Sequence, residues 1–276
     1  MFATINGARL WYEVRGEGEP VLLHHGYTAS RVNWMPVARR LEERFSVILM
    51  ECRGTGESEH TAGGYTLEQY AADVVGLLDH LGIERATFAG HSMGGGIGYL
   101  LGLDHPDRLA RLVLAAPIPA EGVGQITPEL RAQRLEERRR GDREAILARY
   151  RAMKFRDDVE TEAWFEDRAE HILSVSDGHF ERGAESMQAL DVANRLAQLS
   201  TPTLMIAGAV DSLLVPNLLD FMRLPNATLE VLSRAGHELA IHEPDRVTEA
   251  ISSFMTYGVV TAATLLARLE GEQHGG

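Results

Sequence analysis

The sequence predicts an α/β protein whose mostly parallel sheet is covered by helices on both faces. Short runs that are almost wholly apolar alternate with longer segments that have the 3.6-residue period of a helix. This alternation is typical of parallel strands that are buried on both faces. The 276 residues are enough for one large domain, or for one core with an insertion, without a metal ion or a disulfide to hold it together.

The sheet is expected to begin with a hairpin over residues 2–15, because Asn6-Gly7 suits a two-residue turn with positive φ. Bounded apolar runs predict six further strands, at 20–24, 45–50, 86–89, 109–116, 203–207 and 228–232. The clearest helix runs from Leu67 to Leu81 and ends at Gly82. Further helices are expected at 33–43, from 94 to about 104, and from 244 to beyond 254.

Residues 118–195 interrupt this alternation. They contain no convincing strand, only charged helical stretches at 129–140 and 143–156. We therefore expect a helical lid at 118–195, inserted into a core made of residues 1–117 and 196–276. Acidic and basic residues interleave from Arg134 to Arg140, which favours a solvated helix face over a nucleic-acid site.

The composition excludes several classes of partner. With 27 basic and 40 acidic residues the net charge is −13, which disfavours binding to nucleic acid or anionic lipid. There is no run of 18 apolar residues, so no membrane span is expected, and the N-terminus does not have the pattern of a signal peptide. The single cysteine, Cys52, excludes an intrachain disulfide and fits a reducing compartment. A cytoplasmic protein that acts on a small molecule is expected.

The sequence predicts neither a metal nor a nucleotide cofactor. It has no Cys/His cluster with zinc spacing, and His24 and His25 are expected to point to opposite faces of a strand. The sequence also lacks both the G-x-G-x-x-G fingerprint and a Walker A lysine.

The strongest chemical signal is Gly90-His-Ser92-Met-Gly94, which matches G-x-S-x-G between a predicted strand and a predicted helix. Glycines two residues to either side allow a sharp turn in which neighbouring elements approach closely. The serine hydroxyl then projects above the sheet, beside the free N–H groups of a helix N-terminus. This context predicts Ser92 as a nucleophile.

A serine needs a base to take its proton and an acid to orient that base. His237 follows the last predicted strand, at the sheet edge where catalytic groups gather, and it is the expected base. Asp211 follows the strand at 203–207 and is the expected orienting acid. The competing residues are the histidines His24, His25, His91 and His242 and the acids Glu121 and Asp220.

With these residues the chain resembles the α/β-hydrolase family with a helical lid, over nearly its whole length. The resemblance rests on His24-His25-Gly26-Tyr27, on Arg53-Gly54-Thr-Gly56-Glu-Ser58, on the turn at Ser92, and on the loops that carry Asp211 and Gly236-His237. It implies an eight-stranded sheet that is antiparallel only at its early edge, with the nucleophile after the fifth strand. It also implies an oxyanion hole made by the backbone N–H groups of Tyr27 and Met93.

These features predict a hydrolase that cleaves a carboxylic ester of a small or medium-sized substrate; no amphipathic stretch suggests a lipid surface. The resemblance leaves a lactonase and a cofactor-free perhydrolase open as alternatives. A C–C bond hydrolase is disfavoured, because His91 and Glu238 stand where such enzymes usually carry Asn and Trp. Dehalogenases and epoxide hydrolases are disfavoured because their nucleophile is an aspartate. A non-catalytic ligand receptor remains the alternative from a different class.

Aromatic and apolar side chains are candidates for the pocket wall: Tyr27, Trp34, His91, Met153, Phe155, Trp164 and Phe165. The arginines of the helical segment could bind an acidic substrate, but solvated pairs with Glu136, Glu137 and their neighbours are the simpler interpretation. The segment 259–268 could extend the last helix or make a homodimer contact.

Overall fold

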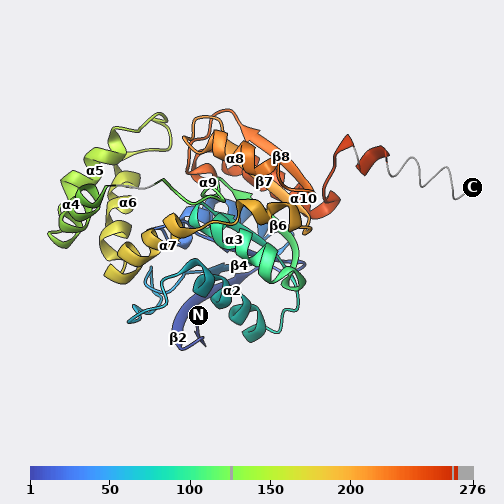
Figure 1. The fold of residues 1–276 in the computed structure, drawn as a ribbon, viewed down its shortest axis with the longest axis horizontal. Coiled ribbons are helices and arrows are strands. Elements are labelled where there is room, and N and C mark those ends of the chain that lie inside the picture. The colour runs from blue at the N-terminus through green and yellow to red at the C-terminus, as the bar shows by residue number, and fades with distance from the viewer. Residues whose placement is uncertain (125–126, 263, 267–276) are drawn as a thin grey trace, which may run out of the picture.

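A computed structural model describes residues 1–124, 127–262 and 264–266. Its eight strands form one sheet in the order β1-β2-β4-β3-β5-β6-β7-β8 (Figure 1). Strand β2 runs antiparallel to β1 and to β4, and all other neighbours pair in parallel, as predicted. The strands are β1 (Phe2–Ile5), β2 (Ala8–Arg15), β3 (Pro20–His24), β4 (Ser46–Met50), β5 (Ala86–His91), β6 (Leu109–Ala115), β7 (Thr203–Gly208) and β8 (Ala227–Leu232).

The N-terminal hairpin has the turn that its sequence indicates. Asn6 and Gly7 both have positive φ, at 47° and 76°, and they connect β1 directly to β2. Asparagine and glycine are the residues that accept this conformation at least cost.

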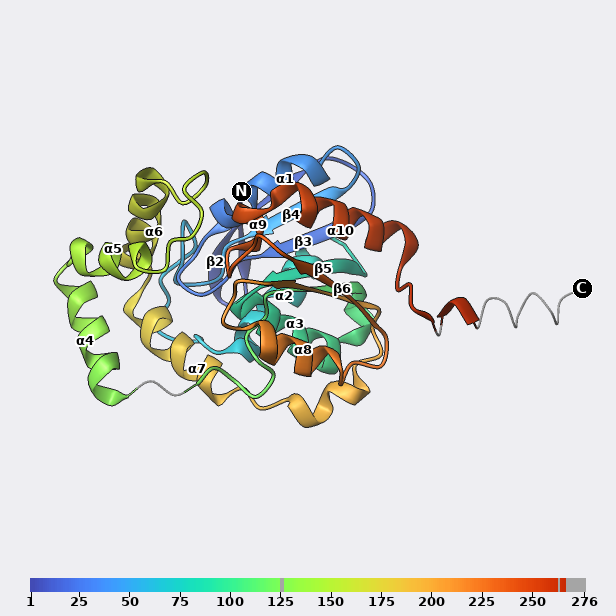
Figure 2. The ribbon, with the colours of Figure 1, turned by 90° about the horizontal axis from the view of Figure 1, so that it is seen from above.

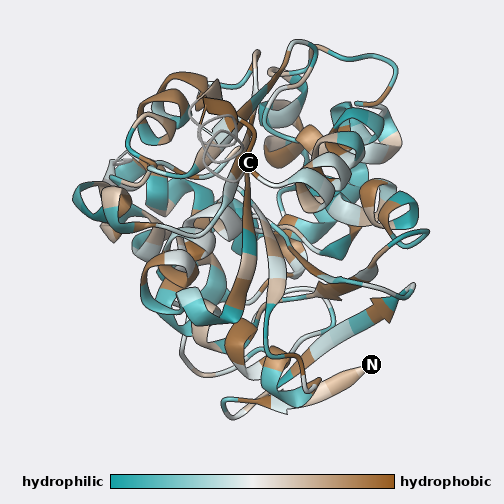
Figure 3. Cartoon of the chain, turned by 90° about the vertical axis from the view of Figure 1, so that its right-hand side faces the viewer, coloured by the Kyte–Doolittle hydropathy of each residue, from teal (hydrophilic) through white to brown (hydrophobic). Residues whose placement is uncertain are grey.

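Helices cover both faces of the sheet (Figure 2). Helices α1 (Met35–Leu41) and α10 (Pro244–Tyr257) lie on one face, and α2 (Leu67–His80), α3 (Met93–Asp104) and α8 (Leu214–Phe221) lie on the other. Each face has its own buried core, and strand β3 alternates between them: Val21 and Leu23 pack with α1 and α10, and Leu22 packs with α2 and α3. Figure 3 accordingly shows apolar colour along central strands and mixed colour on the outer helices.

Between β6 and β7 the chain forms helices, and its described part contains no strand. We call residues 118–195 the helical segment. It contains α4 (Pro128–Arg139), α5 (Arg143–Arg151), α6 (Glu162–Ser174), α7 (Ala184–Ala189) and the short helix η3 (His179–Gly183). The short helix η4 (Ala193–Gln198) begins within it and continues past its end. Helices α5 and α6 enclose a small core of their own, which includes Ile146, Leu147 and Phe165.

Helix α5 is shorter than predicted, because it ends at Arg151 and not near residue 156. The backbone N–H groups of Phe155 and Arg156 donate to the carboxylate of Glu160, at 2.8 and 2.7 Å. This carboxylate gives the two amides partners outside the helix, so a loop forms there.

The expectation that His24 and His25 point to opposite faces is wrong. Strand β3 ends at His24, so side-chain alternation does not continue to His25. The two buried imidazoles stack instead, with their ring centroids 5.2 Å apart.

The last helix does not continue into the segment at 259–268, part of which lies outside the described residues. Helix α10 ends at Tyr257, where Gly258 has a φ of 69°. A glycine with positive φ is a frequent helix terminator. Among the helices described, none has the length and apolar composition needed to cross a bilayer.

Candidate active site

Ser92 lies at the sharp turn between β5 and α3. Its φ of 54° and ψ of −112° are unusual for a residue other than glycine and mark a strained backbone. A Cβ on Gly90 would lie 2.1 Å from the carbonyl oxygen of Gly94, and one on Gly94 would lie 2.7 Å from that of His24. The glycines of the motif therefore permit a backbone approach that no other residue allows.

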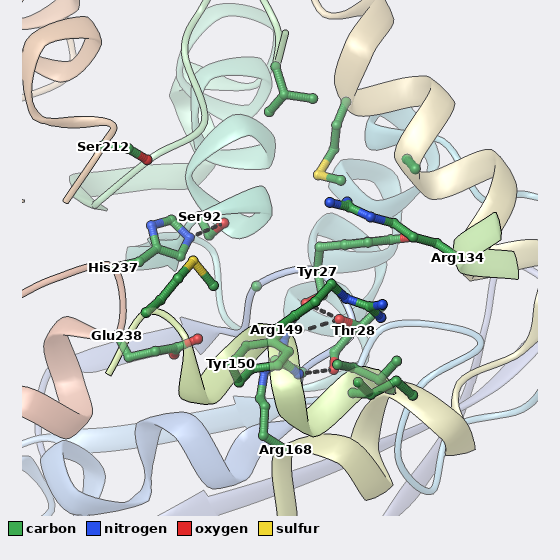
Figure 4. A pocket seen from close by; sticks show the side chains of 18 of the residues that line it. Tyr27, Thr28, Ser92, Arg134, Arg149, Tyr150, Arg168, Ser212, His237 and Glu238 are labelled. Atoms are coloured by element: carbon green, nitrogen blue, oxygen red, sulfur yellow. Dashed lines mark hydrogen bonds between the residues drawn. The ribbon is translucent and has the colours of Figure 1, made fainter. Parts of the chain in front are cut away.

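The structure brings the three predicted site residues together at the carboxyl ends of the strands. The Nε2 atom of His237 lies 2.9 Å from the Oγ of Ser92 (Figure 4). Its Nδ1 lies 2.8 Å from the Oδ2 of Asp211. Asp211 follows β7, and His237 follows β8. Because parallel strands end at one edge of the sheet, residues 145 positions apart in the chain meet there.

Asp211 and His237 each stabilise the charged form of the other. Burial disfavours the imidazolium of His237, but the neighbouring Asp211 carboxylate outweighs that cost and raises the pKa of His237 above its ordinary value. Burial likewise disfavours the charged Asp211, yet its hydrogen bond with His237 holds the pKa of Asp211 below its usual range. A second Asp211 oxygen accepts from the backbone N–H of Leu213 at 3.0 Å, which fixes the carboxylate.

Two backbone N–H groups beside Ser92 are available as donors. Met93 is the first residue of α3, so its N–H has no acceptor within the helix. Tyr27 lies in the turn after β3, and its N–H has no hydrogen-bond acceptor among the described residues. A Cβ on Gly26 would lie 3.1 Å from the Cβ of Ser92, so this turn lies directly against the serine.

The turn that carries Tyr27 is held from the helical segment, a role that the sequence did not indicate. Thr28 has a positive φ of 51°, a strained conformation for a β-branched residue. Arg168, on α6, donates to the carbonyl oxygens of Tyr27 and Thr28 and, at 3.1 Å, to the Thr28 hydroxyl. The Thr28 N–H donates to Nε2 of His179 at 3.3 Å. These contacts fix the backbone next to the Tyr27 amide.

His179 is held in the neutral state that this contact requires. Burial lowers its pKa to about 3. Because Nε2 accepts from Thr28, the ring proton is on Nδ1 and donates to the Tyr70 hydroxyl at 2.8 Å.

The competing histidines lie around the site in other roles. The Nε2–H of His91 donates to the carbonyl oxygen of His237 at 2.8 Å and so supports the loop that carries His237. His242 accepts the N–H of Gly236 at 3.2 Å behind the same loop. His24 and His25 are buried, with their Nδ1 atoms 3.0 and 2.8 Å from the carbonyl oxygens of His25 and Gly26.

The competing acids lie apart from His237. Asp220, on α8, accepts from the Tyr99 hydroxyl at 3.2 Å and from the Ala120 N–H at 2.8 Å. Glu121 is exposed and pairs with Arg223 at 3.0 Å.

A cavity of about 1430 Å³ opens above Ser92, between the core and the helical segment. Of the predicted wall residues, it is lined by Tyr27, His91, Met153, Phe155 and Trp164. Trp34 and Phe165 do not line it. Trp34 is buried in the core with its Nε1–H donating to the carbonyl of His24 at 2.9 Å, and Phe165 packs between α5 and α6.

Arginines for which the sequence favoured solvated pairs form part of the cavity wall. They come from three helices of the helical segment: Arg131, Arg134, Arg138, Arg149 and Arg168. The three on α4 are spaced i, i+3 and i+7, which places them on one face of that helix. This spacing was the available signal, but the sequence does not show what the face covers.

The fold and the site agree with one class of protein. The pattern that defines the α/β-hydrolase fold family matches residues 19–244, and the chain belongs to that family.

Relatives within the family have several hydrolase names. A protein of Caulobacter sp. (strain K31) named as a carbamate hydrolase, RutD, is 31% identical over 92% of this chain and 97% of its own length. The 3-oxoadipate enol-lactonase 2 of Acinetobacter baylyi is 29% identical over 91% of this chain and 95% of its own length. Among solved structures, the enol-lactonase of Burkholderia xenovorans LB400 matches with a TM-score of 0.82 and 27% identity, over 93% of this chain and 100% of that one.

Proposed function

We propose that this protein is a serine hydrolase that cleaves a carboxylic ester of a small or medium-sized substrate through an acyl-enzyme on Ser92. The observation that carries the proposal is the continuous hydrogen-bonded series from the Ser92 hydroxyl through His237 to Asp211, at the floor of a cavity. A hydroxyl, an imidazole and a carboxylate in this order activate a serine on several unrelated folds.

Each residue has one part in the proposed mechanism. Ser92 attacks the ester carbonyl while His237 accepts its proton at Nε2, and Asp211 stabilises the imidazolium. His237 then gives the proton to the leaving alcohol. Water, deprotonated by the same imidazole, attacks the acyl-enzyme and releases the acid.

The oxyanion of each tetrahedral intermediate is bound by the N–H groups of Tyr27 and Met93. A donor of this kind is worth about 3–4 kcal/mol in the transition state. The support for this assignment is that both amides lack other acceptors among the described residues and that the Gly26 turn lies against Ser92.

We further infer that residues 118–195 act as a lid on the core formed by residues 1–117 and 196–276. The support is that the cavity wall opposite Ser92 comes from α4, α5, α6 and the chain around them. A lid of this kind excludes water from the acyl-enzyme and sets the size of the substrate.

A lactonase is the second candidate, because two of the similar proteins are named as enol-lactonases. A lactone is a cyclic ester, so the same serine, base and oxyanion donors would open it. The difference is that the leaving group stays attached to the acyl group after ring opening.

Hydrolysis of 4-nitrophenyl acetate and butyrate tests the proposal. Replacing the nucleophile, Ser92→Ala, is expected to lower kcat by at least about 10⁴-fold. Ser174→Ala, at an exposed serine on α6, serves as the matched control and is expected to keep the wild-type rate. Equal rates for the wild type and Ser92→Ala at neutral pH would refute the serine mechanism.

A further inference from the structure

The arginines of the cavity wall differ in whether they have a partner. Arg131 pairs with Glu185 at 3.0 Å, Arg138 pairs with Asp177, and Arg149 pairs with Glu137. Arg134 has neither an ion pair nor a hydrogen bond within the part of the chain that the structure describes. Its Nε is shielded from solvent and has no acceptor.

Arg168 adds a second positive charge without a carboxylate. It is only 7% exposed, and its hydrogen bonds go to the carbonyl oxygens of Tyr27 and Thr28 and to the Thr28 hydroxyl. Its Nε also lacks an acceptor among the described residues. A guanidinium shielded from water without a counter-ion costs free energy, and an anion in the cavity would remove that cost.

No carboxylate of the same wall forms an ion pair with Arg134 or Arg168 among the described residues, although the charges of Glu238 and Arg168 do interact. Each of these carboxylates has other partners. Glu160 accepts the N–H groups of Phe155 and Arg156. The other three have partners of their own: Glu181 pairs with Arg139 at 3.1 Å, Asp211 binds His237, and Glu238 accepts from Asn33 at 2.6 Å.

The position of Arg134 indicates which half of a substrate it would meet. In Figure 4, His237 lies against Ser92 on one side, and the side chain of Arg134 lies across the cavity on the other. The leaving group must lie beside His237, because that imidazole protonates it. The acyl group therefore extends the other way, past Tyr27 and towards Arg134.

We propose that Arg134 binds a carboxylate at the far end of the acyl chain, so that the substrate is the ester or lactone of a dicarboxylic acid. This inference rests on the proposed function, because it takes Ser92 as the point of acyl transfer. Arg134 holds the carboxylate through charge-assisted hydrogen bonds, and Arg168 adds to the positive potential. The cavity volume of about 1430 Å³ is ample for a substrate with both groups.

Matched ester pairs test this subsite. The mono-4-nitrophenyl esters of glutaric, adipic and pimelic acids carry the free carboxylate, and their methyl-capped counterparts have the same chain without the charge. The ratio of kcat/KM for the free acid to that for the capped ester is expected to exceed about 10 for the best chain length. Subtracting the rate with Ser92→Ala removes spontaneous hydrolysis.

Three variants locate the selectivity. Arg134→Gln is expected to lower the ratio by about 10- to 100-fold, which is the usual value of a hydrogen-bonded charge pair. Arg134→Lys is expected to recover part of it. Arg140→Gln removes the same charge from the exposed end of α4 and is expected to keep the wild-type ratio. The proposal would be overturned if the wild-type protein gave a ratio near or below 1. It would also be overturned if Arg134→Gln left the ratio unchanged.

A binding measurement separates this proposal from the proposed function. Calorimetry with Ser92→Ala protein, which cannot turn the ligand over, compares monomethyl adipate with dimethyl adipate. Preferential binding of the monoanion that disappears in Ser92→Ala/Arg134→Gln supports the subsite even if neither ester series is hydrolysed. Equal binding of both ligands, or binding unaffected by Arg134→Gln, rejects it whatever the catalytic result.

Discussion

In the proposed mechanism His237 acts as the base, and its two ring nitrogens each contact one residue that suits it to this part. The Asp211 carboxylate, 2.8 Å from Nδ1, raises the pKa of His237 against the effect of burial. The same hydrogen bond places the ring proton on Nδ1, so that Nε2 is free to accept from Ser92. The raised pKa of His237 and the position of its ring proton therefore both depend on Asp211.

This dependence predicts the pH profile of the enzyme. His237 must be neutral to accept the Ser92 proton, so kcat/KM should fall as the pH drops through its pKa. Because that pKa is raised, the acidic limb for the wild type should lie above about pH 6.5, the ordinary value. In Asp211→Asn the limb should move to lower pH, and kcat should fall by about 10³- to 10⁴-fold.

Glu121 provides the control for this prediction, because it is the exposed acid that competes with Asp211 in the sequence. Glu121→Gln should keep both the rate and the pH profile. A normal pH profile in Asp211→Asn together with an altered profile in Glu121→Gln would show that Asp211 is not the orienting acid.

At the scale of elements, α6 controls the turn after β3. Arg168 reaches from α6 to the carbonyl oxygens of Tyr27 and Thr28, at the strained backbone beside the candidate oxyanion donor. The helical segment therefore does more than cover the cavity. In the proposed mechanism, its position decides whether the Tyr27 N–H points at the reacting carbonyl.

Removing this contact should lower kcat more than it raises KM. Arg168→Met removes the guanidinium donors from the carbonyl oxygens of Tyr27 and Thr28. We expect kcat for 4-nitrophenyl acetate to fall by at least about 10-fold, since loss of a whole oxyanion donor costs about 10²–10³. This small, neutral ester has no carboxylate, so its kinetics report on the turn alone. Arg168→Lys should recover part of kcat.

Arg143→Met is the matched control, because Arg143 lies on the same helical segment but pairs at the surface with Glu170, at 2.8 Å. A rise in KM with unchanged kcat in Arg168→Met would show that Arg168 contacts the substrate and does not position the turn.

At the scale of the whole molecule, buried histidines make the free energy of unfolding depend on pH. Burial lowers the pKa of His24 to about 4 and that of His179 to about 3, and it lowers the pKa of His25 as well. All three are neutral in the folded protein, where they contact the backbone around the turn after β3. The core therefore contains groups that the unfolded chain would protonate near pH 6.5.

The free energy of unfolding should consequently fall as the pH drops from about 6.5 towards 4. In this window the unfolded chain binds protons that the folded state excludes, and each such histidine contributes up to about 1.4 kcal/mol per pH unit. His237, with its raised pKa, acts in the opposite direction but is outnumbered. Urea unfolding at several pH values measures the slope.

His179→Asn should make this slope shallower, because it removes one of the histidines whose pKa burial lowers. Stability that stays flat or increases on acidification through this window would contradict the prediction.

The strand segments and the positions of Ser92, Asp211 and His237 at strand ends could be predicted because both depend on local patterns. Each strand is a bounded apolar run, and each of the three residues follows the end of one, so the parallel sheet itself brings them together. Contacts made across the cavity leave no such local trace. Arg134 and Arg168 appear in the sequence as ordinary charged helix residues, and only packing against the core shows that they face inward.

The errors in the sequence interpretation have the same origin. As an aromatic residue Trp34 is a candidate for the cavity wall, but its Nε1–H donates to the buried carbonyl oxygen of His24 and the side chain lies in the core. Stacking of His24 on His25 depends on where β3 ends, and the end of α5 depends on a carboxylate, Glu160, several residues further along. In each case the structure depends on a contact that the hydrophobic periodicity of the segment does not indicate.

Covalent labelling tests the central role of Ser92 most directly. The protein would be treated with a fluorophosphonate, which phosphonylates activated serines, and its intact mass and labelled peptide determined by mass spectrometry. We expect one adduct per chain, located on Ser92, absent in Ser92→Ala and formed far more slowly in His237→Gln. Labelling at the wild-type rate in Ser92→Ala, or no labelling of correctly folded wild-type protein, would contradict the assignment of Ser92 as the nucleophile.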